Sequence, residues 1–381
     1  MKSKTMGLSR YKLGELIELS GEVNSDGIYG VDAVRGINNM KEMMKSKADL
    51  NGRDLTKFQI VRPGHFVFNH RTSRNGSKFS ITYNYDSESR IFTEDYVVFH
   101  IKDDCSNILL KEWLYIYFCR PEFDRYVITN SWGSSTEFFN WDDICDIDIK
   151  LPSIEQQRKY VDVYLSLQKN LEAYQSKVDE LKLVCDGYLD KLKNGNGRLK
   201  IGELLEEVDN RNNGSKIQSV KGINIEKSFM DSVADTNGVD LSKYKVVNEN
   251  EFAFSGMQTG RDECIRIALN ESCNPIIVSP AYTVLKVKSD VALVPYIQLW
   301  FSRKEIDRYG WFASDASIRS NLDLERFFDM QIPIPSIDIQ RSIASIYKVY
   351  KERKAIAAQL KEQLNNLCPI LIKGSLQNYN N

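Results

Sequence analysis

The most constraining feature of this sequence is an internal duplication. The segment PSIEQQR at 152–158 returns as PSIDIQR at 335–341. The offset between the two copies drifts slightly along the chain, as small insertions and deletions in surface loops allow. Two related units on one chain predict a pseudo-two-fold protein that presents similar surfaces to two similar partners. Three further matches support the duplication: DLTKF at 54–58 with DLSKY at 240–244, GIN at 36–38 and 222–224, and GEL at 14–16 and 202–204.

The composition is that of a globular protein. The chain has 381 residues, 42% of them hydrophobic and 27% charged, which is enough for two or three domains with their own cores. No apolar run is long enough to span a bilayer, and none follows the first residues, so we expect a cytoplasmic protein with no membrane contact. Seven cysteines without C-x-x-C spacing indicate reduced thiols and no zinc site. A net charge of −1 leaves nucleic-acid binding open, because local clustering of Lys and Arg decides it.

Each copy begins with a mixed segment and ends with a helical one. Alternating apolar and β-branched residues at 66–68, 96–101 and 282–287 predict strands. Residues 111–119 and 295–303 have the pattern of short amphipathic helices. The mixed segments are therefore expected to be α+β.

The helical segments carry a different pattern. From Ser153 to about Lys193, apolar residues recur at alternating spacings of four and three, which is typical of a long coiled-coil helix. The second copy repeats this seam from Ile343 to Leu371, with Arg353 as the one misfit. Pro369 is expected to kink or end the second helix.

These patterns divide the chain into four parts. We expect mixed domains at 1–152 and 198–335, a central long helix at 153–197, and a C-terminal long helix at 336–381. Two separate helical hairpins, each packed on its own domain, would bury the two seams. Pairing of the two long helices with each other would also bury them. Neither half contains a second long helix to cover its own seam, so the sequence favours an antiparallel coiled coil of the two.

This organisation resembles the specificity subunit of type I restriction–modification systems, over essentially the whole chain. The most specific elements are IDIKLP at 147–152 and its counterpart MQIPIP at 330–335, each followed by a Gln-Arg helix start. The segments at 132–136 and 313–319 look like the small-residue segment that precedes this strand in the family, although the second lacks the glycine.

The resemblance implies two target-recognition domains, each reading one half of a bipartite site in double-stranded DNA. The helices would set the spacing between the half-sites and dock two methyltransferase subunits. The chain itself would be non-catalytic and hold no cofactor. S-adenosylmethionine would belong to the methyltransferase subunits, and ATP with Mg to a restriction and translocase subunit where one exists. The candidate partner-binding residues are Gln157, Arg158, Gln340 and Arg341.

The motifs of the relevant enzymes are missing from the sequence. It contains no G-x-x-x-x-G-K-[ST], no G-x-G-x-x-G and no Asn/Asp-Pro-Pro-Tyr/Phe segment of an adenine methyltransferase. His65, His70 and His100 all lie in the first half, so a duplicated active site could not use a histidine. We expect no catalytic residue in this chain. The alternatives are a self-contained methyltransferase or nuclease and a symmetric scaffold that binds only protein.

Polar and basic residues follow two equivalent strands, after 66–68 in the first copy and after 252–254 in the second. Arg, Lys, Asn and Gln are the side chains that read base edges, so these loops are candidates for DNA recognition. Ordinary solvated loops would have the same composition. The candidates are Asn69, Arg71, Arg74, Asn75 and Lys78 in the first copy, and Ser255, Gln258 and Arg261 in the second.

Two further groups of residues have weaker patterns. A second basic stretch is interrupted by acidic residues, so a phosphate contact and a plain solvated surface fit it equally well. It consists of Lys41, Lys45, Lys47, Arg53 and Lys57. Three tryptophans near strand ends are expected to pack in the core or between domain and helix, since burial is the common role of an indole ring. They are Trp132, Trp141 and Trp311.

Overall fold

In the computed structural model the chain forms two compact units. Unit 1 comprises residues 1–173 and 356–381, and unit 2 comprises residues 174–355. The structure describes residues 8–377 apart from 47, 73–77, 134–136, 194–196, 233–237, 258, 289 and 316–320, and it does not describe the side chains of residues 260 and 261.

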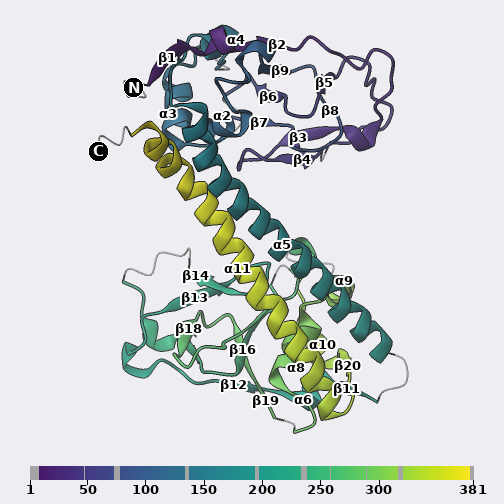
Figure 1. The fold of residues 1–381 in the computed structure, drawn as a ribbon. Coiled ribbons are helices and arrows are strands. Elements are labelled where there is room, and N and C mark those ends of the chain that lie inside the picture. The colour runs from purple at the N-terminus through teal and green to yellow at the C-terminus, as the bar shows by residue number, and fades with distance from the viewer. Residues whose placement is uncertain are drawn as a thin grey trace. The chain divides into compact units, whose positions relative to one another are not determined.

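The duplication is visible in the main sheets. Each unit contains an antiparallel four-stranded sheet, with order β2-β9-β6-β7 in unit 1 and β12-β19-β16-β17 in unit 2 (Figure 1). A separate two-stranded sheet joins the start of each domain to the strand before its long helix, β1 with β10 and β11 with β20. These strands are β1 (Ser9–Lys12), β2 (Ile17–Leu19), β6 (Phe66–Asn69), β7 (Ile81–Tyr83), β9 (Tyr96–Ile101), β10 (Asp148–Leu151), β11 (Arg198–Lys200), β12 (Leu205–Val208), β16 (Glu251–Ser255), β17 (Arg266–Leu269), β19 (Thr283–Val287) and β20 (Gln331–Pro333).

A second set of strands is also duplicated. In unit 2 it forms one sheet of order β14-β13-β18-β15, in which β13 and β18 are parallel. In unit 1 the pairs β3-β4 and β5-β8 are joined by a single parallel bridge between Val34 and Ile91. These strands are β3 (Arg35–Ile37), β4 (Met43–Lys45), β5 (Gln59–Val61), β8 (Arg90–Phe92), β13 (Val220–Ile223), β14 (Phe229–Asp231), β15 (Lys245–Val247) and β18 (Ile276–Val278).

Short helices cover the main sheets. The helix from Lys111 to Phe118 buries five of its eight side chains, among them Trp113, against the aromatic residues of β6 and β9. Its counterpart in unit 2 buries Tyr296 and Trp300 in the same way. The short α-helices are α1 (Leu13–Leu16), α2 (Lys111–Phe118), α3 (Pro121–Thr129), α4 (Trp141–Cys145), α6 (Ile201–Leu204), α7 (Thr259–Asp262), α8 (Val294–Phe301), α9 (Lys304–Ala313) and α10 (Leu324–Asp329). Short 3₁₀ turns lie at Val31–Ala33, Asp103–Cys105, Asn213–Ser215 and Leu241–Lys243.

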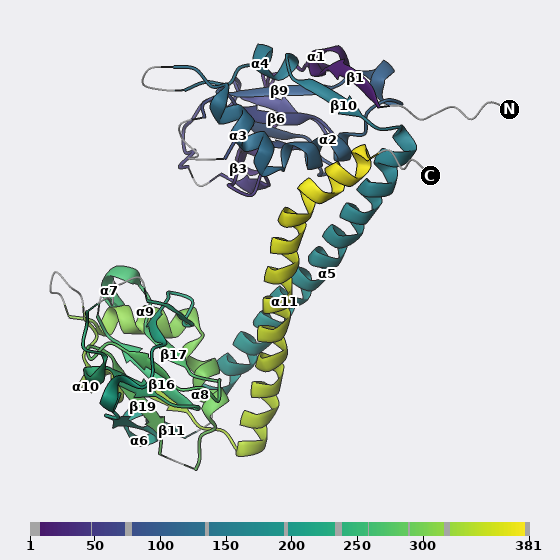
Figure 2. The ribbon, with the colours of Figure 1, turned by 90° about the vertical axis from the view of Figure 1, so that its left-hand side faces the viewer.

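The two predicted long helices are α5 (Ile154–Leu192) and α11 (Ile337–Leu376). Within each unit, part of α5 lies beside part of α11 (Figures 1 and 2). In unit 1, Tyr164 of α5 and Cys368 of α11 belong to one hydrophobic cluster. In unit 2, Cys185 of α5 shares a cluster with Tyr347 of α11. Each seam is thus covered by the other long helix, which confirms the pairing expected from the sequence.

The two irregular positions of the second seam have simple explanations. Arg353 places its guanidinium over the ring of Tyr174, 5.4 Å from the ring centroid, so a cation–π contact replaces an apolar contact. Tyr174 of α5 contacts Arg353 of α11, and Cys185, further along α5, shares a cluster with Tyr347, which comes earlier in α11. The two helices therefore run antiparallel in unit 2. Pro369 lies inside α11 and does not end it, since the helix continues to Leu376.

A buried ion pair is repeated in both units. Lys41 Nζ lies 2.6 Å from an oxygen of Asp124, and in unit 2 Lys227 Nζ lies 2.6 Å from Asp307. Both lysines have a left-handed backbone, with φ of 62° and 61°, which directs the side chain inward from a turn. Each aspartate also accepts a backbone N–H at 3.0 Å. Lys41 is therefore a buried structural residue, and the expectation that it belongs to an exposed basic stretch is wrong.

Replacing Lys41 by Met should destabilise unit 1 by about 3–5 kcal/mol, because Asp124 would be left as a buried charge without its partner. The matched control is Lys361→Met, which removes the more exposed pair of Lys361 with Glu42 and should cost at most about 1 kcal/mol. Urea unfolding of the full chain measures both. Equal destabilisation of the two variants would contradict a structural role for the buried pair.

Candidate nucleic-acid interface

Two segments that are distant in the sequence meet in unit 1. The loop that follows β6 lies against the segment before α4: Thr72 N–H donates to Glu137 O and Phe139 N–H donates to His70 O, both at 2.9 Å. Isolated β-bridges join Phe138 to Arg71 and to Trp132. We call residues 69–72 together with 130–133 and 137–139 loop pair 1. Asn69 and Arg71, two of the DNA-reading candidates, therefore belong to one feature with Trp132 and Gly133, the described part of the small-residue segment.

The same meeting occurs in unit 2. The loop after β16 approaches the segment before α10, and Leu322 N–H donates to Gly256 O at 2.9 Å. A Cβ at position 256 would lie 1.7 Å from the carbonyl oxygen of Leu322, so this close approach requires glycine. We call residues 255–257 with 313–322, as far as they are described, loop pair 2.

The candidate residues of loop pair 1 are partly held by hydrogen bonds. Asn69 Oδ1 accepts the backbone N–H of Arg71 at 2.9 Å, which shapes the turn after β6. Arg71 Nη2 lies 3.1 Å from Asp95, and both side chains are about one-third exposed. Lys78 is exposed. The geometry therefore leaves Arg71 and Lys78 accessible to an anionic or hydrogen-bonding partner.

The other candidates are placed differently. Ser255 is buried at the end of β16, opposite Arg266 of β17, and its role in reading DNA stays a prediction. Arg261 lies in α7, and its side chain is outside the described part of the structure. Arg74, Asn75 and Gln258 lie outside the described residues.

The tryptophans correct the sequence-based expectation. Trp132 is 75% exposed in loop pair 1, and Trp311 is 53% exposed in α9 beside Phe312, which is 84% exposed. Only Trp141 packs as expected, with its ring centroid 5.6 Å from that of Phe99. Exposed aromatic rings of this size usually mark an interaction surface. Sequence reasoning missed them because strand-end tryptophans are more often buried.

Two of the three histidines lie against each other in unit 1. His65 and His100 stack with centroids 4.7 Å apart, and His100 Nε2 lies 3.1 Å from Glu18. Burial lowers the pKa of His65 below its ordinary value, and the nearby His100 lowers it further. Among the described residues, no group of His, Cys, Asp and Glu has the arrangement of a metal site.

The two glutamines at the helix starts are buried and satisfied. Gln157 Nε2 donates to Ile108 O at 2.7 Å and to Pro152 O at 3.0 Å, while its Oε1 accepts Leu110 N–H at 2.9 Å. Gln340 repeats this network with the three equivalent backbone groups of unit 2. Both side chains are fully buried, and each fastens its long helix to the segment that precedes α2 or α8. Their role in docking a partner stays a prediction.

The two arginines that follow these glutamines remain available. Arg158 and Arg341 are exposed, and Arg341 pairs with the still more exposed Asp338 at 3.0 Å. A cavity of about 280 Å³ adjoins the first helix start and is lined by Tyr11, Asn107 and Ser153 among others. Of the four candidate partner-binding residues, the two arginines are therefore the ones that a partner could reach in this structure.

Replacing Gln157 by Leu should destabilise unit 1 by at least about 3 kcal/mol, because one buried N–H and two buried carbonyl groups lose their partner. Arg158→Ala, one residue further on, is the matched control and should change stability by no more than about 0.5 kcal/mol. Thermal or urea unfolding of the two variants compares them. Similar stability of Gln157→Leu and the wild type would show that the network is not structural.

Comparison with known proteins supports one fold. No protein-family model matches the chain, and no curated protein matches it in sequence. The S subunit of a type I restriction-modification system from M. genitalium is 14% identical and has a TM-score of 0.61, over 100% of this chain and 98% of its own. The HsdS subunit from Thermoanaerobacter tengcongensis is 14% identical and has a TM-score of 0.37; the alignment covers 98% of this chain and 97% of that one. A structure on complex assembly and conformational transition of the type I R-M system is also 14% identical and has a TM-score of 0.44; the alignment covers 97% of this chain and 98% of that one.

The fold assignment rests on the first of these structures. Among the described helices, none has both the length and the apolar character needed to cross a membrane. The likeness to the S subunit covers both domains and both long helices, which agrees with the duplicated topology described above. The resemblance predicted from the sequence is thereby confirmed, and this chain has the fold of the S subunit of type I restriction–modification systems.

Proposed function

We propose that this chain is the non-catalytic DNA-specificity subunit of a type I restriction–modification complex. The observation that carries the proposal is the whole-chain likeness to an S subunit, with a TM-score of 0.61 over 100% of this chain. Domains 1–152 and 198–335 are proposed to read one half each of a bipartite site in double-stranded DNA. Loop pairs 1 and 2 are the proposed recognition surfaces.

The duplication supports two readers with different specificities. The scaffold is repeated down to single side chains: Asn84 Nδ2 donates to Val61 O and Glu88 O, and Asn270 makes the two equivalent bonds. The loops on this scaffold differ, since Arg71 follows β6 whereas Gly256 and Met257 follow β16. A constant framework with divergent polar loops is what two half-sites of different sequence require.

The long helices are proposed to set the spacing and dock the partners. Arg158 and Arg341 are exposed at equivalent positions, so the two helix starts offer similar surfaces to two copies of one methyltransferase subunit. S-adenosylmethionine would then be bound by those subunits, and ATP with Mg by a restriction subunit where one exists. A protein-only scaffold is the second candidate. The partly exposed Arg71 and the exposed Trp132 in one loop pair favour DNA, because cationic and aromatic side chains together suit phosphates and bases.

Exchanging residues 1–152 for those of a relative with another specificity should change one half of the methylated sequence and leave the other half intact. The reason is that each domain carries its own loop pair on its own sheet. Mapping of methylated adenines by single-molecule sequencing, with the chain in complex with its methyltransferase, measures the result. Changes in both halves would be incompatible with two independent readers.

Arg71→Ala should weaken DNA binding. If the guanidinium contacts a base edge, discrimination at one position of the site should fall by about 1–3 kcal/mol; if it contacts only phosphate, the preferred sequence stays and the salt dependence becomes shallower. The control is Arg62→Ala, because Arg62 precedes β6, away from loop pair 1, and pairs with Glu22 as Arg71 pairs with Asp95. Affinity and methylation pattern unchanged from the wild type would remove Arg71 from the interface.

A further inference from the structure

Two positive charges face each other across a hairpin in unit 1. Arg35 of β3 and Lys45 of β4 are direct partners in the antiparallel register. Directly opposed side chains lie on the same face of a strand pair with Cβ atoms roughly 5 Å apart, so like charges there destabilise the hairpin. The equivalent partners in unit 2 are Lys221 and Asp231, which form an ion pair of 2.5 Å. The same position is thus neutralised in one unit and doubly positive in the other.

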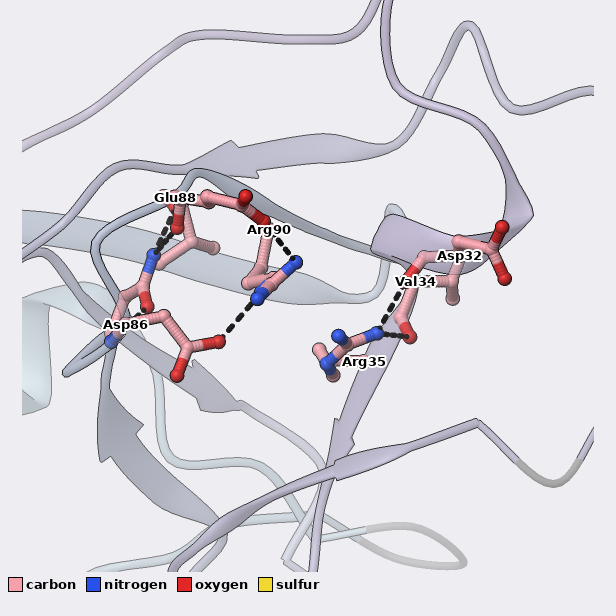
Figure 3. Close-up of polar contacts among 8 residues, drawn as sticks. Asp32, Val34, Arg35, Asp86, Glu88 and Arg90 are labelled. Atoms are coloured by element: carbon pink, nitrogen blue, oxygen red, sulfur yellow. Dashed lines mark hydrogen bonds and ion pairs between the residues drawn. The ribbon is translucent and has the colours of Figure 1, made fainter.

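The guanidinium of Arg35 is held in place without a carboxylate. Its Nη1 donates to the carbonyl oxygens of Asp32 and Val34, at 2.6 and 2.9 Å (Figure 3). Arg90, in the same view, pairs instead with Asp86 at 2.6 Å and Glu88 at 3.1 Å. Backbone carbonyls orient a guanidinium but do not cancel its charge. Within the part of the chain that the structure describes, Arg35 and Lys45 have no acidic side chain within ion-pair distance.

These two side chains border a cavity of about 260 Å³. Its lining also contains Ser46 and Asn51, which add hydrogen-bonding groups, and the acidic Asp32 and Asp49. The Oδ1 of Asp49 accepts the backbone N–H of Asn51 at 3.0 Å, which orients this carboxylate within its own turn without cancelling its charge. The carboxylate of Asp32 points away from Arg35 in Figure 3. The two positive charges of the lining thus lie together on β3 and β4, and the cavity is large enough for a phosphate group.

We propose that Arg35 and Lys45 form a phosphate site that holds the DNA backbone beside the first half-site, and that unit 2 lacks this site. The inference rests on the proposed function and deepens it. Cations fixed across a hairpin position a duplex without reading its sequence. The first half-site is then bound with more counterion release than the second, because its reader neutralises an additional phosphate. The opposed charges, unfavourable in the free hairpin, are compensated when the phosphate is bound.

Lys45→Asp tests the proposal, because it places in unit 1 the cation–aspartate pair that unit 2 already has. The hairpin should fold normally, with an unfolding temperature equal to or above that of the wild type. For the full-length chain with its methyltransferase partner, the slope of log K against log salt should become shallower by about 1, since each phosphate that the protein neutralises contributes about 0.9 to it. The preferred DNA sequence should not change. Lys243→Asp, an exposed lysine of unit 2 with the same change of charge, should leave the slope unaltered.

Five outcomes are decisive. A shallower slope for Lys45→Asp and not for Lys243→Asp supports the phosphate site, whereas an unchanged slope overturns it and leaves the proposed function standing. An equally shallower slope in both variants would mean a non-specific charge effect and would also overturn it. If the wild-type complex binds no DNA, the proposed function fails. The unfolding temperature of the full chain is then measured with and without inorganic phosphate. Phosphate that raises the unfolding temperature of the wild type but not of Lys45→Asp would show a free-phosphate site, and overturn only the assignment to DNA.

Discussion

Burial of the apolar seams of α5 and α11 is the constraint on which the rest of this structure depends. A helix of about 40 residues with one apolar stripe is unstable in water unless another surface covers that stripe. Here each unit takes one part of each helix into its core. In unit 1 the end of α11 completes the core of the first domain, where Trp113 Nε1 donates to Ser375 Oγ at 3.1 Å. The first unit thus needs both ends of the chain, and neither half of the sequence is self-sufficient.

The fastening points of these helices are the most faithfully duplicated part of the molecule. Gln157 and Gln340 each satisfy three backbone groups at the start of a long helix. In the domains themselves, the pairs Lys41–Asp124 and Lys227–Asp307 fix a turn to α3 and to α9. A buried polar group must keep all of its partners, because an unsatisfied one costs free energy at once. Such networks therefore resist change after a duplication. Surface loops have no such restriction, and it is there that the two units differ.

The contrast between the units is itself informative about function. At one pair of equivalent positions, Arg35 and Lys45 oppose each other in unit 1, whereas Lys221 and Asp231 attract each other in unit 2. At another, the loop after β6 carries Arg71, and the loop after β16 requires Gly256 for contact with Leu322. Differences of charge and loop shape on a common scaffold are the expected result when two copies specialise for two different ligand segments.

The sequence by itself determined the duplication, the α+β class, the two long helices and their pairing, because periodicity and repetition are properties of the chain order. It also identified the helix starts and the loop after β6, but not which of those side chains reach the surface. Gln157 and Lys41 are polar and so were expected outside, whereas tertiary packing buries them with complete hydrogen bonding. Trp132 is apolar and was expected inside, yet a bridge to Phe138 holds its segment on the surface. Burial depends on which distant segments meet, and only the tertiary structure decided that.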